Sequence, residues 1–401
     1  MLSSELIAIT LVAPSLGIPA RSGGSIRTLA LANWLARHSR LTLVAPGNGL
    51  DTDELPFRVV VVDPITSSLG KVLRRVRASA RGAPRGWEWA IHRALEWHAV
   101  KALEEGELVI LCQLMTLPNI PRDMRSDVWI DSHDLVSVRF ARRSLAGKAA
   151  RSYRHRKATK FEQAALATVD AFLVCSEFER REALRLVPKA RVHVVENGTH
   201  DLTPHPLPPQ GTAYFIGTLD YEPNVEGLRW FLAEIWPRVR ASVPDARVLV
   251  AGSGDAEWIE HIVDASDGVS LRSNVSNAHA ALSGFRVCIV PLLSGSGTRI
   301  KVLEAAAMAH PIVATRVGAE GLDLPASLLP ATDTPQQFAN RLSLLMTSDL
   351  EAQSQASALR TWVEPLRWET IFDQRLAPLL EHRMAGRHAF QRNGQRRGRR
   401  F

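Results

Sequence analysis

The sequence has little cysteine and no long apolar run. Its three cysteines, Cys112, Cys175 and Cys288, each lie at or near the end of an apolar segment. They have neither the number nor the spacing of a disulfide framework or a metal site, so we expect buried free thiols. No apolar run approaches the roughly 18 residues that span a bilayer. Leu6–Val12 is short and follows Glu5, unlike a signal peptide with its basic start, so we expect a cytoplasmic protein.

Acidic residues are missing from two parts of the chain. Arg383–Arg400 has seven arginines and no Asp or Glu, and Arg139–Lys160 has nine Lys and Arg and no Asp or Glu. Lys71–Lys101 is also basic and contains three tryptophans. We expect these segments to bind an anionic membrane surface, with a solvated charged face as the alternative. Nucleic acid is not an expected partner, because no aromatic stacking platform accompanies the arginines.

The length and the alternation of segments predict two α/β domains. The chain has 401 residues, with 46% hydrophobic and 22% charged residues, which is typical of a soluble globular protein. Apolar strand-like runs alternate with helical spacing in both halves, and four prolines lie between Asn197 and Gly211. We predict an N-terminal acceptor-side domain over 1–197, a linker over 198–211, a C-terminal nucleotide-sugar domain over 212–363, a helix over 364–383 and a disordered basic tail over 384–401.

The expected fold is two doubly wound, Rossmann-like domains that face a central cleft. In the first domain we expect strands at 6–12, 41–45, 58–62, 107–112, 127–131, 170–175 and 191–195, and helices at 26–38, 68–80, 87–104, 136–168 and from 177. In the second we expect strands at 213–217, 247–251 and 287–290, and helices at 223–240, 256–264, 299–309, 335–347 and 350–360. Ligands of such sheets bind beyond the carboxyl ends of the strands.

A glycine-rich turn follows the strand at 287–290. Gly295, Ser296 and Gly297 allow a tight turn that exposes backbone amides, and Thr298 is suited to cap a helix that begins near Arg299. A helix start carries unpaired N–H groups and a partial positive charge, so it suits a phosphate group. The pattern is neither a Walker loop nor a dinucleotide fingerprint, and an ordinary β-α-β unit is the alternative.

Charged residues in this helix strengthen the phosphate interpretation. Arg299 and Lys301 place two cations in the first turn, where they are unfavourable for the helix unless an anion lies in front of them. Glu304 follows about one turn later, and a carboxylate there suits two vicinal ribose hydroxyls.

Other polar and glycine residues also follow predicted strands and are expected to face the same cleft. They are Gly23, Gly24, His133, Gly217, Thr218, Gly252 and Gly254. A turn that needs glycine explains Gly252 and Gly254 equally well. Asp131 and Asp134 flank His133, and capping of the next helix explains at least one of them, so neither is assigned as a general base.

With these residues placed, residues 6–380 resemble the family-four retaining glycosyltransferases of the GT-B fold. The resemblance rests on 195–201, 216–237 and 295–315. It implies that Glu304 holds the nucleotide ribose. The first Glu of the family's paired carboxylates falls on Ser296, and its usual Arg and Lys fall on Thr218 and approximately Asn224.

The resemblance also implies a nucleotide-sugar donor, transfer with retained anomeric configuration and no obligatory metal. His133 matches the family's loop histidine near the transferred sugar. The local patterns and the resemblance together predict His133, Arg299 and Lys301 as catalytic residues. The predicted donor-binding residues are Gly23, Gly24, Gly217, Thr218, Gly252, Gly254, Gly295, Ser296, Gly297, Thr298 and Glu304.

We therefore expect a metal-independent glycosyltransferase of the hexosyltransferase type. It would move a sugar from a UDP- or GDP-sugar to a glycan or lipid-linked acceptor, in cell-surface polysaccharide or glycolipid synthesis. The nucleotide-sugar is a substrate, so no cofactor is expected, and the protein would work in the cytoplasm or on the inner face of the membrane. Two alternatives stay open: an epimerase or phosphorylase of the same fold, and a GT-B relative that binds sugar nucleotides or serves as a scaffold without turnover.

Overall fold

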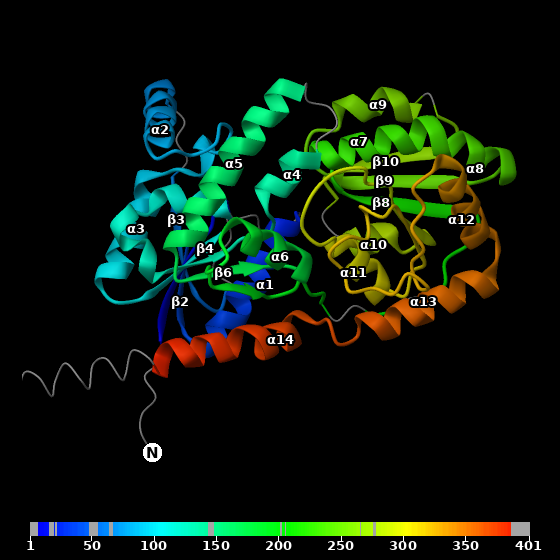
Figure 1. Ribbon diagram of the computed structural model, residues 1–401. Helices are drawn as coiled ribbons and strands as arrows, with labels where there is room; N and C mark the ends of the chain where they lie inside the picture. The colour runs from blue at the N-terminus through cyan, green and yellow to red at the C-terminus, as the bar shows by residue number, and fades with distance from the viewer. Residues whose placement is uncertain are drawn as a thin grey trace, which may run out of the picture.

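The computed structural model describes residues 7–15, 20, 22–47, 55–63, 67–142, 148–200, 203–204, 206–264, 266–275 and 278–385, without the side chains at 140–152, 154, 264 and 278–279. Two α/β units lie side by side, each built on a parallel sheet (Figure 1). The predicted disordered tail over 384–401 starts too early, because residues 384–385 are still helical, and residues 386–401 lie outside the described residues. Within the described ranges, no helix is both long and apolar enough to cross a membrane.

The N-terminal unit has a seven-stranded parallel sheet in the order β3-β2-β1-β4-β5-β6-β7. Its strands are β1 (Ala8–Val12), β2 (Arg40–Pro46), β3 (Arg58–Val62), β4 (Leu108–Cys112), β5 (Val128–Asp131), β6 (Ala171–Val174) and β7 (Val192–Val194). Its helices are α1 (Gly23–His38), α2 (Ser68–Ala80), α3 (Arg93–Glu104), α4 (Val136–Arg142), α5 (Lys148–Thr168) and α6 (Glu177–Leu186). Strands β2 and β3 lie on one side of β1, and β4 and the strands after it lie on the other. The strand order therefore reverses between β1 and β4, and open sheets bind ligands in the crevice at such a point.

The C-terminal unit repeats this topology with five parallel strands in the order β10-β9-β8-β11-β12. Its strands are β8 (Thr212–Thr218), β9 (Arg247–Ser253), β10 (Val269–Ser273), β11 (Val287–Val290) and β12 (Ile312–Ala314). Its helices are α7 (Glu222–Trp230), α8 (Trp236–Ser242), α9 (Glu257–Asp264), α10 (Ala278–Leu282), α11 (Ile300–Ala307), α12 (Pro335–Thr347) and α13 (Asp349–Val363). The reversal here lies between β8 and β11.

Both sheets are covered by apolar side chains on both faces. In β1, Ile9 and Leu11 belong to one cluster of buried residues and Val12 belongs to the cluster on the other face. In β11, Ile289 and Cys288 are divided in the same way. A strand buried on both faces reads as a continuous apolar run, which is why these strands are recognisable in the sequence. The predicted fold of two doubly wound α/β units is confirmed.

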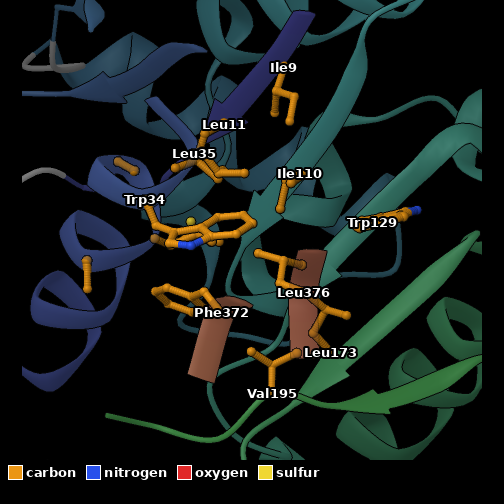
Figure 2. Packing of buried hydrophobic residues seen from close by; sticks show 14 of the residues in the cluster. Ile9, Leu11, Trp34, Leu35, Ile110, Trp129, Leu173, Val195, Phe372 and Leu376 are labelled. Carbon is orange, nitrogen blue, oxygen red and sulfur yellow. The ribbon is translucent and has the colours of Figure 1, made fainter. Parts of the chain in front are cut away.

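The last helical segment returns to the N-terminal unit. After α13 the chain runs through α14 (Trp368–Ile371) and a π-helical turn at Phe372–Leu376 to the far side of the first sheet (Figure 1). Phe372 and Leu376 pack with Trp34 in the core of the N-terminal unit (Figure 2). The Trp34 indole N–H also donates to Asp373 Oδ1 at 2.7 Å. The chain therefore connects the two units twice, once near residue 200 and once near residue 365.

Several predicted helix bounds are wrong. The helix at 26–38 begins at Gly23, because the Ser22 side chain accepts the backbone N–H of Ser25 and so caps an earlier turn. The predicted helix 87–104 is a 3-10 turn at Glu88–Ala90 followed by α3. The predicted helical region 136–168 contains α4 and α5, and residues 143–147 between them lie outside the described residues.

Candidate active site

The loops after β1, β5, β8 and β11 meet where the two units contact each other. Gly297 has a positive φ of 75°, and a Cβ there would lie 3.0 Å from the carbonyl oxygen of His133. A Cβ on Gly23 would lie 3.5 Å from Ile300 Cδ1 at the start of α11. Residues from the ends of two sheets are therefore in contact, as the shared cleft predicted from the sequence requires.

Two hydrogen bonds join the glycine-rich turn to the N-terminal unit. The Ser296 hydroxyl donates to Asp134 Oδ2 at 2.7 Å. The Asn197 side-chain amide donates to the Thr298 hydroxyl. A narrow pocket beside this turn is lined by Val138, Ser176, Phe178 and Glu179 of the N-terminal unit and by Ser296, Gly297, Glu320 and Gly321 of the C-terminal unit.

The predicted cap of the following helix is wrong. Helix α11 begins at Ile300, its N-cap is Arg299, and no side chain caps it. Thr298 lies one residue too early, and its hydroxyl is held by Asn197 instead. The first N–H groups of α11 therefore have no side-chain cap from the N-cap residue, which leaves them available to an anion.

Arg299 is a buried cation with unused hydrogen-bond donors. The residue is only 8% exposed, and its Nη1 donates to the Ser296 carbonyl oxygen at 2.5 Å. Neither Nε nor Nη2 has a hydrogen-bond partner among the described residues. Burial lowers the pKa of Arg299, while Tyr221, Glu320 and Glu179 oppose that shift. Since buried polar groups are nearly always paired in native proteins, these donors point to a ligand.

The side chain of Lys301 extends from α11 toward the end of β8. Its Nζ donates to Asn224 Oδ1 at 3.2 Å and lies 4.0 Å from the centroid of the Phe215 ring. A Cβ on Gly217 would lie 2.8 Å from Nζ, so only glycine at this position leaves the lysine its place. Desolvation lowers the pKa of Lys301 to about 7, and Arg299 contributes in the same direction.

Glu304 follows Lys301 by one turn of α11. Desolvation raises the pKa of its carboxyl to about 7, while Lys301 opposes that shift. Lys301 and Glu304 are therefore two half-buried residues on one helix, a base and an acid, and the charge of the lysine affects the pKa of the carboxyl. Thr218, at the end of β8, accepts a hydrogen bond from the Asn224 side-chain amide through its carbonyl oxygen, 2.8 Å away.

His133 is held in an unusual conformation beside a buried ion pair. Its φ is +62°, and Nε2 lies 3.1 Å from Asp131 Oδ2. Although burial raises the pKa of Asp131, Arg27 and His133 keep it well below its usual range. By hydrogen-bond geometry, neither ring nitrogen has a partner among the described residues. Nδ1 lies 3.6 Å from where a Cβ on Gly24 would be.

The prediction that at least one of the two aspartates caps the next helix is wrong. Asp131 pairs with Arg27, and Asp134 is bonded to Ser296 and lies 3.3 Å from Arg139 Nη1. The backbone N–H groups at the start of α4 are instead bonded by two buried glutamates. Glu179 accepts from Leu135 N, and Glu162 accepts from Ser137 N. Desolvation raises the pKa of each of these two carboxyls to about 7.

Sequence reasoning missed Gln113 and the interdomain role of Asp134. Gln113 follows β4 with a φ of +64°, and its Nε2 lies 2.7 Å from where a Cβ on Gly24 would be. A glutamine in the left-handed region is uncommon, and such strain gathers at functional sites. No sequence signal marked Gln113, and the contact of Asp134 with Ser296 could not be predicted because the two residues are 162 positions apart.

Gly252 at the end of β9 and Gly254 just after it have a structural reason to be glycine. A Cβ on Gly252 would lie 1.8 Å from the Gly217 carbonyl oxygen, and a Cβ on Gly254, where φ is +96°, would lie 2.4 Å from Asp220 Oδ1. They therefore allow close packing against the end of β8 and against the loop that follows it. Gly295 also has a positive φ, +121°, beside the Arg299 guanidinium. Among the described residues no group of three or more His, Cys, Asp or Glu side chains is arranged to hold a metal ion.

Comparisons with known proteins agree with this architecture. Residues 210–348 match the family profile described as "Glycosyl transferases group 1". The chain is similar to sucrose-phosphate synthase of Thermosynechococcus elongatus, with a TM-score of 0.70 at 18% identity over 95% of this chain and 100% of that one. It is also similar to HepE of Anabaena, solved with UDP and glucose, with a TM-score of 0.65 at 14% identity over 93% and 99% of the two chains. The chain has the GT-B fold of these structures.

Two further proteins are informative. The pneumococcal O-GlcNAc transferase GtfA, solved with UDP and GlcNAc, matches with a TM-score of 0.60 at 11% identity over 92% of this chain and 97% of that one. A Klebsiella pneumoniae protein, described as an uncharacterized 44.6 kDa protein in the cps region, is 31% identical over 114 residues. That match spans 27% of this chain and 29% of the Klebsiella protein.

Proposed function

We propose that this protein is a glycosyltransferase that moves a sugar from a UDP- or GDP-sugar to a glycan or lipid-linked acceptor, with retention of the anomeric configuration. The match of residues 210–348 to group 1 glycosyl transferases supports the reaction class. The UDP and sugars bound to the similar structures of HepE and GtfA support the donor class. The Klebsiella relative from a cps region supports a role in polysaccharide synthesis.

The observation that carries the proposal is the buried Arg299 guanidinium at the start of α11, two nitrogens of which have no hydrogen-bond partner in the described ranges. A diphosphate placed there would accept hydrogen bonds from Nε and Nη2 and from the uncapped N–H groups of the helix. Lys301 and Glu304 follow on the same helix, close enough to influence each other's charge. In this arrangement the Glu304 carboxylate accepts hydrogen bonds from the ribose hydroxyls, and the Lys301 ammonium contacts a phosphate.

The proposed reaction depends on charge stabilisation. As the bond between the sugar and the diphosphate breaks, negative charge builds on the leaving diphosphate. Arg299, Lys301 and the backbone amides of the glycine-rich turn are already in place to stabilise it, which is the kind of preorganised electrostatics that accelerates group transfer. We propose that these groups make a divalent metal unnecessary, so turnover in excess EDTA is the expected result.

The residues near the proposed sugar position come from the N-terminal unit. His133 and Gln113 both lie close to Gly24. Asp134 brings a carboxylate to Ser296, the position where the resemblance expects the first of two glutamates. We propose that Asp134 serves in place of that glutamate, on the opposite side of the cleft.

The test is binding and turnover with a panel of UDP- and GDP-sugars and the free nucleotides. A ligand present at 100 times its Kd adds about 2.7 kcal/mol to the free energy of unfolding, so a thermal shift identifies the base. Release of UDP or GDP from one sugar donor, with and without EDTA, then tests turnover. If no nucleotide shifts the melting temperature, the proposal is refuted. If a nucleotide binds and none of its sugar derivatives is consumed or transferred, the protein is a non-catalytic sugar-nucleotide-binding relative, the alternative predicted from the sequence.

A further inference from the structure

Helix α2 (Ser68–Ala80) exposes an apolar stripe to solvent. Leu69, Val72, Leu73 and Val76 are 70%, 51%, 60% and 62% exposed. Their spacing of i, i+3, i+4 and i+7 places all four on one face of the helix. Surface helices normally turn such a stripe toward the core, because each exposed aliphatic side chain leaves unburied apolar area. Burial of apolar area in the core of this chain therefore does not explain the stripe.

The attachment of α2 explains the direction of the stripe. Ala78 is the buried residue of this helix, and it packs with Ala83 and Ile91. At about 100° per residue, Ala78 lies on nearly the opposite side of the helix from the centre of the stripe. Arg77 and Arg81 donate to the Glu96 carboxylate of α3, which ties the end of α2 to the N-terminal unit. Figure 1 shows α2 at the outer end of that unit, away from the C-terminal unit.

The charges on α2 itself and on the segment after it have one sign. Between Ser67 and Trp87 there are six Lys and Arg residues and no Asp or Glu. Arg77 and Arg81 are paired with Glu96, and the others are Lys71, Arg74, Arg75 and Arg85. Trp89 and Trp97, 43% and 57% exposed, lie on neighbouring elements: the 3-10 turn that carries Trp89 contacts α2, and Trp97 follows Glu96. Aliphatic, cationic and tryptophan side chains together are the composition of an interfacial helix.

We propose that α2 docks this protein on an anionic lipid bilayer, with its apolar stripe in the acyl boundary and its cations at the headgroups. A helix of 13 residues is about 20 Å long, so it lies in the plane of the interface. A second copy of the chain fits this surface poorly, because a symmetric contact would place two helices of the same positive charge side by side. One helix face also offers less than the roughly 800 Å² per partner that a standard interface buries.

The test is co-sedimentation of the full-length protein with vesicles of phosphatidylcholine containing about one third phosphatidylglycerol. Leu69→Asp/Leu73→Asp should lower the partition coefficient on the order of tenfold or more, because the stripe then carries acids. The matched control is Leu344→Asp/Leu350→Asp, which changes two leucines that are 41% and 79% exposed on the C-terminal unit, and it should bind as the wild type does.

The cation arm uses Lys71→Glu/Arg75→Glu. This variant should also lose binding, and its remaining binding should depend less on salt. Equal binding of Leu69→Asp/Leu73→Asp and wild type would overturn the proposal. A dimer without lipid that Leu69→Asp/Leu73→Asp dissociates would overturn it in favour of a second copy. Binding to heparin that depends on the cations and not on the leucines would overturn it in favour of a soluble polyanion.

This proposal goes beyond the donor site and does not depend on it. Helix α2 contributes no residue to the cleft described above, so Leu69→Asp/Leu73→Asp should consume a soluble donor at the wild-type rate. Loss of vesicle binding with intact turnover separates the two proposals. Absence of turnover in the wild type, with vesicle binding that the leucine variant abolishes, would refute the transferase and leave the docking helix standing.

Discussion

The two buried arginines at the cleft have opposite expected roles, and replacing each by methionine tests this. Arg27 is fully bonded: its guanidinium donates to Asp131, to the Asn197 side chain and to the carbonyl oxygens of Val195 and Glu196. Arg299 makes one hydrogen bond, and two of its nitrogens have no partner in the described part of the chain. We infer that Arg27 holds the fold together and that Arg299 is kept for a ligand.

The two substitutions are expected to change the free energy of unfolding in opposite directions. Arg27→Met leaves the buried Asp131 carboxylate without its main partner, and breaking a buried ion pair in this way costs about 3–5 kcal/mol. Arg299→Met removes two unpaired buried polar groups, each costing about 1–3 kcal/mol, and loses one charged hydrogen bond of about 1.5–3 kcal/mol. The net expectation is a gain of about 2 kcal/mol in the free energy of unfolding. That corresponds to a melting temperature higher by about 4–8 °C for a domain of this size.

The assay combines thermal unfolding without ligand and nucleotide binding by calorimetry. Arg299→Met should unfold at a higher temperature than the wild type and should bind neither UDP nor GDP. Arg27→Met should unfold at a lower temperature. A lower melting temperature for Arg299→Met together with unchanged nucleotide affinity would refute the reasoning, because Arg299 would then be a structural anchor.

Three further predictions concern the donor site and the tail. Glu304→Gln should weaken binding of the ribonucleotide by about 10–100-fold, since hydrogen bonds to a charged acceptor are worth about 1.5–3 kcal/mol. The same substitution should leave binding of the 2′,3′-dideoxynucleotide unchanged, and equal losses for both nucleotides would contradict the ribose contact. Lys301, with a pKa lowered to about 7, is mostly neutral at pH 8, and a bound diphosphate favours its charged form, so binding at pH 8 should take up close to one proton. Calorimetry in buffers of different ionisation enthalpy measures this uptake, and its persistence in Lys301→Gln would show that another group is responsible. Removal of residues 386–401, with their six arginines, should leave unfolding unchanged and weaken binding to anionic vesicles, and equal binding with and without them would dismiss the tail as a membrane contact.

Local sequence was a sound guide to strands buried on both faces and to the glycine-rich turn. Val287–Val290 and Pro335–Thr347 have the bounds that the sequence predicted. Such elements are recognisable because their signals, a continuous apolar run or a capped helical period, lie within a few residues of each other. Helix starts were less predictable. Gly23–Gly24 resemble a loop in the sequence, yet Ser22 caps a helix that begins there.

The return of the chain to the first unit was beyond local reasoning. The sequence predicted a helix over 364–383 and gave no sign of where it packs. Its apolar residues Phe372 and Leu376 contact Trp34, more than 300 positions earlier, in a single cluster of buried side chains (Figure 2). A helical period shows that a face is to be buried and carries no information about its partner.

By itself, the amino-acid sequence determined the class of fold, two parallel α/β units, and the chemical character of the turn at Gly295–Gly297 with Arg299, Lys301 and Glu304 beside it. Those features depend on spacing along the chain. Tertiary structure alone decided which charges are paired. It gave Arg27 a full set of acceptors and placed Asp134 against Ser296. It left two nitrogens of Arg299 without a partner among the residues that the structure describes. The stripe on α2 likewise points to solvent only because Ala78 holds the opposite face. Pairing and exposure depend on neighbours brought together by folding, and those neighbours are distant in sequence.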